Sequence, residues 1–287
     1  MKKSTFLRTS ISLCAIAFLS SAWAGNGANF VLYNHHTEKA GDSAVMLLND
    51  FAQDENNQPY TAQMITIERG MTDRWASEFM VESQKTPGEP YRATGWRWEN
   101  RYRFFDYGAF LNPVLYVEWE NLKTTTRYAM EISGRTDSES GEPGATSEGI
   151  LETRLILGHD FSDRFNVAFN WINETNAKTK ATDYGYALGL NHGLLGAGHD
   201  TKSHGHHAPG SQGSFAVREL TLGVELYGGL GNSKKGITAR SGVTEHYLGV
   251  NLASHLSNGL MFQTGLASGL TSASQRGFLR FMVGYDF

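Results

Sequence analysis

Short stretches in which apolar and polar residues alternate recur along nearly the whole chain, and this period of two limits the possible folds more than any other feature. Within residues 93–105, aromatic residues take alternate positions, and most of the positions between them are Arg or Glu. Successive side chains of a β-strand point to opposite faces, so the pattern indicates strands with one apolar and one polar face. The sequence therefore predicts an all-β fold.

The alternating stretches are consistent with a single antiparallel up-and-down β-barrel that crosses a membrane. Charged residues of both signs occur on the polar face of single strands, and aromatic residues gather toward strand ends, as in barrels with a wet lumen. A soluble sandwich shows the same alternation but not this polarity. The pattern predicts about twelve strands, at 43–52, 61–69, 74–84, 93–105, 112–121, 149–159, 164–174, 183–191, 214–228, 243–253, 259–267 and 277–287.

The lengths of the connections support this topology. The connections 70–73, 106–109, 160–163 and 254–258 are brief and contain Asp, Ser, Asn or Gly, which stabilise tight turns. The alternate connections include 122–148 and 229–242, which are long and polar and are expected to be extracellular. Residues 192–213 break the rule, either because a strand is miscounted or because the periplasmic side carries an insertion.

The first residues predict export. Lys2, Lys3 and Arg8 precede an apolar run from Ile11 to Leu19, and small residues follow up to Ala24. This order is typical of a signal peptide, here cleaved after Ala24. We therefore expect a signal peptide at 1–24, a periplasmic N-terminal segment at 25–42 and a barrel domain at 43–287. The residues alone leave three alternatives for 25–42: a periplasmic tail, a short plug or an additional strand.

Composition excludes several classes of function. The only cysteine, Cys14, lies within the signal peptide, so the mature chain has neither a disulfide framework nor thiolate chemistry. Removing the three basic residues of the signal peptide changes the formal charge from −4 to −7. Nucleic-acid-binding proteins usually carry a basic surface, so we expect no nucleic-acid partner.

The last strand ends in an alternating apolar and aromatic series of Phe281, Val283, Tyr285 and the terminal Phe287. This tail resembles the C-terminal assembly signal of Gram-negative outer-membrane β-barrel proteins, although it identifies no particular transport family. The resemblance implies location in the bacterial outer membrane. It also implies contact with outer-membrane lipids and lipopolysaccharide, and recognition of the tail by the barrel-assembly machinery.

A histidine-rich stretch is a candidate metal site. Clustered imidazoles can chelate Zn²⁺, Cu²⁺ or Ni²⁺ when the rings are neutral. A flexible loop rich in Gly and Ser also offers little fixed geometry, so adventitious binding is the alternative. The candidate ligands, with Asp200 beside them, are His192, His199, His204, His206 and His207.

The segment from His255 to Gly259 resembles the His-x-Ser-Asn-Gly motif of outer-membrane phospholipase A. The resemblance implies Ser257 as an acyl-transfer nucleophile and His255 as its base. However, the predicted topology puts these residues on a periplasmic turn, whereas that family's site faces the outer leaflet. Since Ser-Asn-Gly also suits an ordinary hairpin turn, we favour the turn.

Charged residues on the predicted inner face are candidates for a selectivity constriction. They could select solutes by sign and size, or they could pair into a salt-bridged plug, and the sequence leaves both alternatives open. The residues are Glu78, Glu82, Arg97, Glu99, Arg101, Arg103, Glu118, Glu120, Glu152, Arg154, Glu219, Glu225 and Arg280.

The leading functional hypothesis is therefore passive passage or binding of small polar solutes, which requires no cofactor. The first alternative is a metal-binding surface or structural barrel that uses the histidine-rich stretch and Zn²⁺, Cu²⁺ or Ni²⁺. The second is an outer-membrane lipid acyl hydrolase.

Overall fold

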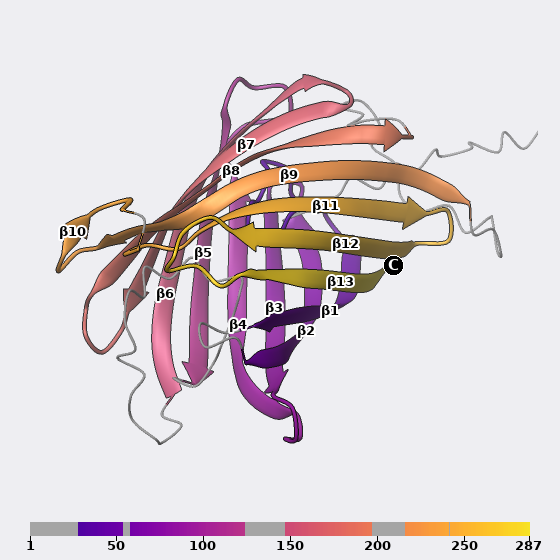
Figure 1. The fold of residues 1–287 in the computed structure, drawn as a ribbon. Helices are drawn as coiled ribbons and strands as arrows, with labels where there is room; N and C mark the ends of the chain where they lie inside the picture. The colour runs from indigo at the N-terminus through magenta and orange to yellow at the C-terminus, as the bar shows by residue number, and fades with distance from the viewer. Residues whose placement is uncertain (1–27, 54–57, 124–146, 197–215, 241) are drawn as a thin grey trace, which may run out of the picture.

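The computed structural model describes residues 28–53, 58–123, 147–196, 216–240 and 242–287. All the strands in these residues belong to one antiparallel sheet, which Figure 1 colours along the chain. Its strands are β1 (Ser43–Gln53), β2 (Pro59–Thr72), β3 (Trp75–Lys85), β4 (Arg92–Arg103), β5 (Asn112–Lys123), β6 (Ser147–Ser162), β7 (Phe165–Asn176), β8 (Thr182–Leu195), β9 (Val217–Asn232), β10 (Gly236–Ile237), β11 (His246–Leu256), β12 (Leu260–Gly269) and β13 (Gly277–Asp286). No helix in this part of the chain has the length and apolar character needed to cross a bilayer.

Twelve long strands close into a barrel, as the sequence predicted. Each strand pairs with its neighbour in the chain, β8 pairs with β9, and β1 pairs with β13, so the ring has no free edge. Closure matters because an unpaired backbone N–H or C=O in hydrocarbon costs several kcal/mol. The direct pairing of β8 with β9 also shows that no wall strand was miscounted between residues 192 and 213, which favours an insertion.

The short strand β10 was not predicted. β9 continues to Asn232, beyond the predicted end at residue 228, and forms a hairpin with β10. The side-chain oxygen of Asn232 accepts hydrogen bonds from the backbone N–H groups of Lys234 and Lys235, at 3.1 and 2.8 Å, and so closes the turn. This hairpin lies within the connection expected to be a long polar loop at 229–242.

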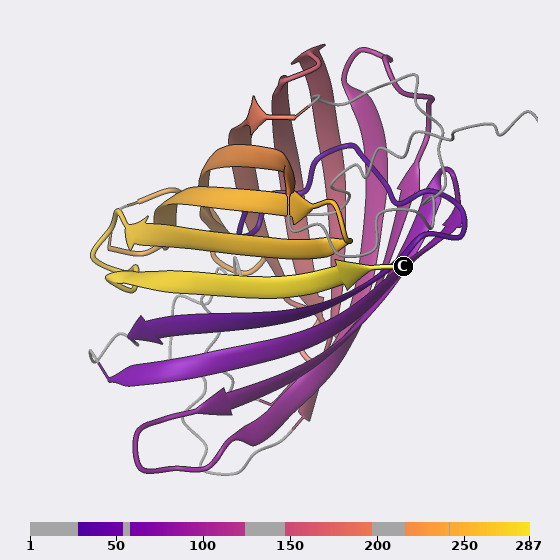
Figure 2. The same ribbon diagram turned by 90° about the vertical axis from the view of Figure 1, so that its right-hand side faces the viewer.

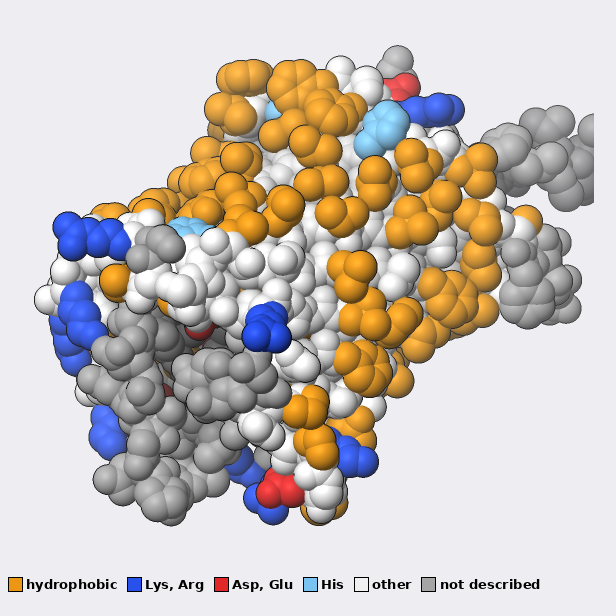
Figure 3. Space-filling model, viewed as in Figure 1, with side chains coloured by type: hydrophobic (Ala, Val, Ile, Leu, Met, Phe, Trp, Pro, Cys, Tyr) orange, Lys and Arg blue, Asp and Glu red, His pale blue; other side chains and the backbone are white. Residues whose placement is uncertain are grey.

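The outer face of the barrel is apolar along its strands. Figure 3 shows hydrophobic side chains spread over the outside of the wall, with charged groups gathered toward the ends. Exposed fractions reach 53% for Trp98 and 64% for Leu266, values that suit contact with lipid rather than water. On this face Gln63 donates a hydrogen bond to Asn49 at 2.7 Å, so these two polar side chains satisfy each other.

The N-terminal segment does not lie outside the barrel. In Figure 2 the indigo chain before β1 runs within the ring of strands toward the end that holds the C-terminus. Residues 28–37 are all buried. For residues 28–37, the structure therefore replaces the expected periplasmic segment with the short plug, one of the three alternatives, because the lumen supplies partners for its backbone.

Insertion of a charge into the outer face should be costly only near the middle of the wall. We expect Val250→Arg, in the centre of β11, to lower the free energy of unfolding by about 2–4 kcal/mol. Leu256→Arg, on the same face at the end of the same strand, should cost about 0–1 kcal/mol. Urea unfolding of the protein folded into lipid vesicles measures both. Equal costs would contradict a bilayer centred on the wall.

Candidate functional site

Of the thirteen charged residues predicted for the inner face, twelve are at most 8% exposed, whereas Glu219 on β9 is only half-buried. The fold buries these charges because every second residue of each strand must face the lumen. Their burial requires partners, since an isolated ion transferred out of water is strongly disfavoured. Whether they select solutes is a separate question that their position alone does not answer.

Arginine side chains of the lumen lie among carboxylates from neighbouring strands. Arg97 contacts Glu82 through Nε, and its Nη1 lies 3.3 Å from both Glu118 and Glu120. Arg97 on β4 therefore links β3 to β5. Three carboxylates in one small volume repel one another unless the guanidinium stays between them.

Two other arginines make similar links. Arg101 contacts Glu68 and Glu99, while Arg280 holds Asp50 through two parallel contacts of 2.8 and 2.7 Å. The fork of a guanidinium matches the two oxygens of a carboxylate, which makes this pair specific in direction. It joins the first strand of the barrel to the last.

Strand register arranges the acidic residues into an oblique row that the sequence did not reveal. Residues paired directly across neighbouring strands link seven carboxylates from β2 to β8, in the order Glu68, Glu78, Glu99, Glu118, Glu152, Glu174 and Asp183. Because the strands are staggered around a barrel, such a row climbs from one end of the lumen toward the other. Glu68 lies near the β2–β3 turn and Asp183 near the opposite end.

The plug is held by side chains of the wall that bond to its backbone. The Glu225 carboxylate accepts hydrogen bonds from the backbone N–H groups of Phe30, Val31 and Leu32, the latter two at 3.1 and 3.0 Å. The Asn170 side chain accepts from the Tyr33 N–H and donates to the Tyr33 carbonyl, both at 2.8 Å. A buried segment outside any sheet needs such partners for its backbone groups.

Arginines of the predicted lumen set bond to the same segment. Arg154 donates to the Val31 carbonyl at 2.7 Å, and Arg280 donates to the Phe30 carbonyl at 3.2 Å. Tyr33 in turn donates its hydroxyl hydrogen bond to Glu99 at 2.7 Å. The charged lumen and the plug are therefore one network, and two of the predicted selectivity arginines are bound to the plug backbone.

Inward-facing glycines provide the space for the plug. A Cβ on Gly265 would lie 2.7 Å from the Phe30 ring, and one on Gly249 would lie 2.9 Å from it. The ring fits there edge-on against Phe278, at a centroid distance of 4.9 Å. Glycine within a strand often marks a place where another segment approaches closely. Lumen-facing glycines were therefore the sequence signal that could have indicated the plug.

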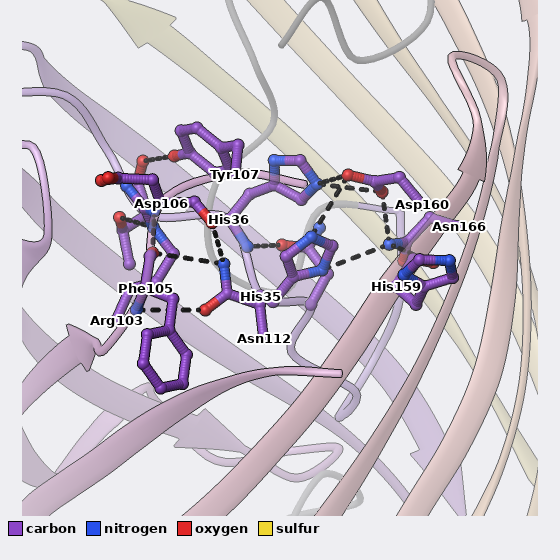
Figure 4. A network of polar contacts seen from close by, with 12 residues as sticks. His35, His36, Arg103, Phe105, Asp106, Tyr107, Asn112, His159, Asp160 and Asn166 are labelled. Carbon is purple, nitrogen blue, oxygen red and sulfur yellow. Dashed lines mark hydrogen bonds and ion pairs between the residues drawn. The ribbon is translucent and has the colours of Figure 1, made fainter. Parts of the chain in front are cut away.

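A second polar group joins the plug to β6 at the turn end of the barrel, and Figure 4 shows it. The Nε2 atoms of His35 and His36 lie 3.2 and 3.1 Å from the same oxygen of Asp160. Asn166 on β7 donates to the other Asp160 oxygen at 2.8 Å. Neither the histidine pair nor Asp160 was among the predicted site residues, since only the tertiary structure brings them together.

The predicted hydrolase pair occupies the turn end as well. His255 is buried on the inner face of β11, and its Nε2 lies 2.7 Å from Asp286. Ser257 follows β11 in a short turn, where its backbone N–H donates to the Ala216 carbonyl at 2.9 Å. This position agrees with the turn interpretation, while the catalytic hypothesis stays a prediction.

Two predicted sites remain: the histidine-rich stretch, only part of which the structure describes, and the C-terminal tail. His192 lies on β8 with an exposed ring 6.4 Å from that of Phe165. His199, His204, His206 and His207 lie outside the described residues, so the metal hypothesis for this stretch stays a prediction. Phe281, Val283, Tyr285 and Phe287 all have exposed side chains, and their recognition by assembly machinery also stays a prediction.

No protein-family model matches the chain. No curated protein matches it either. Among solved structures, the KdgM porin aligns with a TM-score of 0.51 and 10% identity over 85% of this chain and 99% of that chain. An outer membrane channel from Pseudomonas putida F1 aligns with a TM-score of 0.52 and 11% identity over 88% of this chain and 98% of that chain. The chain thus has the fold of outer-membrane barrels.

The Arg97 cluster should be a large contributor to stability. Arg97→Gln leaves Glu82, Glu118 and Glu120 facing one another without the charge that compensates them. We expect it to lower the free energy of unfolding by about 3–5 kcal/mol at neutral pH. Arg74→Gln, which removes an exposed 2.7 Å pair with Asp106, should leave the free energy of unfolding nearly unchanged. Urea unfolding compares the two, and equal small losses would contradict the proposed role of Arg97.

Proposed function

We propose that this chain is an exported outer-membrane channel for small polar solutes, that it prefers cations, and that its N-terminal segment closes it. The observation that carries the proposal is the row of seven carboxylates along the lumen wall. An apolar exterior and a closed ring suit residence in a bilayer, and the resemblance of the fold to a porin and a channel supports the same class.

The balance of charge inside the barrel supports the preference for cations. The carboxylate row alone contains seven acidic groups, whereas the arginines of the predicted lumen set number five. Rings or rows of Asp and Glu favour cation passage because they replace part of the ion's hydration and repel anions. The arginines divide the row and keep neighbouring carboxylates apart.

The plug supports the gating part of the proposal. Residues 28–37 are buried inside the barrel, where Glu225 of β9, Asn170 of β7 and Arg154 of β6 attach them to the wall. These attachments are hydrogen bonds to side chains, so they can be exchanged for water without breaking the barrel's own ladder. A solute path through this level requires the segment to shift.

Loss of the Glu225 anchor should open the channel. Glu225→Ala leaves the N–H groups of residues 30–32 without their shared acceptor, so the plug should leave the lumen more often. In a planar bilayer we expect the open probability or the unitary conductance to rise at least several-fold over the wild type. Glu219→Ala is the control, because Glu219 lies on the same strand as Glu225, opposite His255 of β11 in the strand register. Wild-type behaviour of Glu225→Ala would contradict gating.

Ion preference tests the acidic row separately. In a KCl gradient, the reversal potential of the open Glu225→Ala channel should indicate preference for K⁺. The added changes Glu174→Gln and Asp183→Asn should reduce that preference, whereas Glu89→Gln, in an exposed connection, should not. A preference for Cl⁻ would overturn the proposal.

A barrel that never conducts, although its folding is confirmed by heat-modifiable gel mobility, would favour a closed binding or structural protein.

A further inference from the structure

His35, His36 and Asp160 bring three metal-ligating side chains together from two parts of the chain that are far apart in sequence. The histidines belong to the plug and Asp160 to the turn end of β6. One ligand atom from each residue lies within 4.8 Å of the others. The side chains of His35, His36 and Asp160 are only 1%, 4% and 9% exposed.

The distances between the ligand atoms suit a small tetrahedral ion. Zinc bonds of about 2.0–2.1 Å to nitrogen and oxygen put two ligands of a tetrahedron about 3.3–3.4 Å apart. The two imidazole Nε2 atoms are 3.2 and 3.1 Å from the Asp160 Oδ2. Both imidazole–carboxylate distances therefore agree to within a few tenths of an ångström with those around such an ion.

The carboxylate itself gives an independent indication. Within the described part of the chain, Asp160 Oδ2 is buried and lies at ion-pair distance from both imidazoles without an aligned hydrogen bond, while His36 Nε2 also lies 3.2 Å from Oδ1. A buried carboxylate oxygen normally has an aligned donor, since its desolvation is otherwise costly. The oxygen faces the space between the two Nε2 atoms (Figure 4), where a cation would supply the missing interaction.

The neighbouring residues fix the orientation of the ligands. Asn166 donates to Asp160 Oδ1 at 2.8 Å, and its carboxamide lies 3.4 Å from His35 Nδ1. The His36 ring stacks on Tyr107 with an interplanar angle of 20°, and the Tyr107 hydroxyl donates to the Thr37 carbonyl at 3.1 Å. Metal sites depend on such a supporting shell, which orients imidazole and carboxylate ligands.

We infer that His35, His36 and Asp160 form a site for a divalent transition-metal ion that fastens the N-terminal segment to the barrel wall. Two imidazoles and one carboxylate suit Zn²⁺, with Co²⁺, Ni²⁺ and Cu²⁺ as other ions of matching preference, and leave a fourth coordination position. The ion binds the assembled pair of segments and so favours the seated plug. This site is distinct from the histidine-rich stretch and does not depend on whether the barrel conducts.

The test must separate this site from the loop histidines. We would therefore use the refolded mature chain with His199, His204, His206 and His207 replaced by Asn, and titrate it with Zn²⁺ by calorimetry and with Co²⁺ by visible absorption. We expect one bound ion per chain and a Co²⁺ spectrum of low coordination number. No binding to this protein would overturn the inference.

Single substitutions in that background then locate the ion. His36→Asn and Asp160→Asn should each weaken Zn²⁺ binding by more than 100-fold, and Asn166→Ala by about 10–100-fold through loss of ligand orientation. His159→Ala is the matched control, since His159 is adjacent to Asp160 but packs against Phe110 and Phe161. Heat-modifiable mobility checks the folding of every variant. Unchanged affinity in His36→Asn and Asp160→Asn, or an equal loss in His159→Ala, would overturn the inference.

Discussion

Every backbone N–H and C=O inside a bilayer or a poorly hydrated lumen must find a partner within the protein, and this requirement governs both parts of the structure. In the wall it is met by closure, through the β8–β9 and β1–β13 pairs that remove both edges of the sheet. In the plug, which belongs to no sheet, it is met by side chains such as Glu225 and Asn170. The same constraint thus explains a regular wall and an irregular insert.

Charged side chains of the lumen help to meet this requirement for the plug. Arg154 and Arg280 each bond to a carbonyl of the plug while they also pair with carboxylates of the wall. These two arginines therefore hold the plug to the wall, whether or not they also contact a solute. In the proposed channel, movement of the plug would release guanidinium groups into the lumen and change the local charge, so the proposed gating and ion preference would depend on the same side chains.

The metal site and the Glu225 anchor hold different parts of one segment. Glu225 binds residues 30–32 from β9, while the histidine pair at 35 and 36 meets β6, from which β7 and β8 separate β9 in the wall. A segment fixed at two points loses more conformational freedom than one fixed at a single point, and release at one point leaves the other in place. An ion at the turn end would thus tune how readily the segment shifts without itself blocking the lumen.

The sequence by itself determined the barrel, its twelve long strands and the inward position of the charged residues, because a period of two directly records which face each residue occupies. It also placed the short turns, since Asp, Ser, Asn and Gly act locally. Only the tertiary structure decided the pairing of Arg97 with three carboxylates, the carboxylate row and the meeting of His35 and His36 with Asp160. These depend on strand register and on a segment folded back into the lumen, and local periodicity carries no information about either.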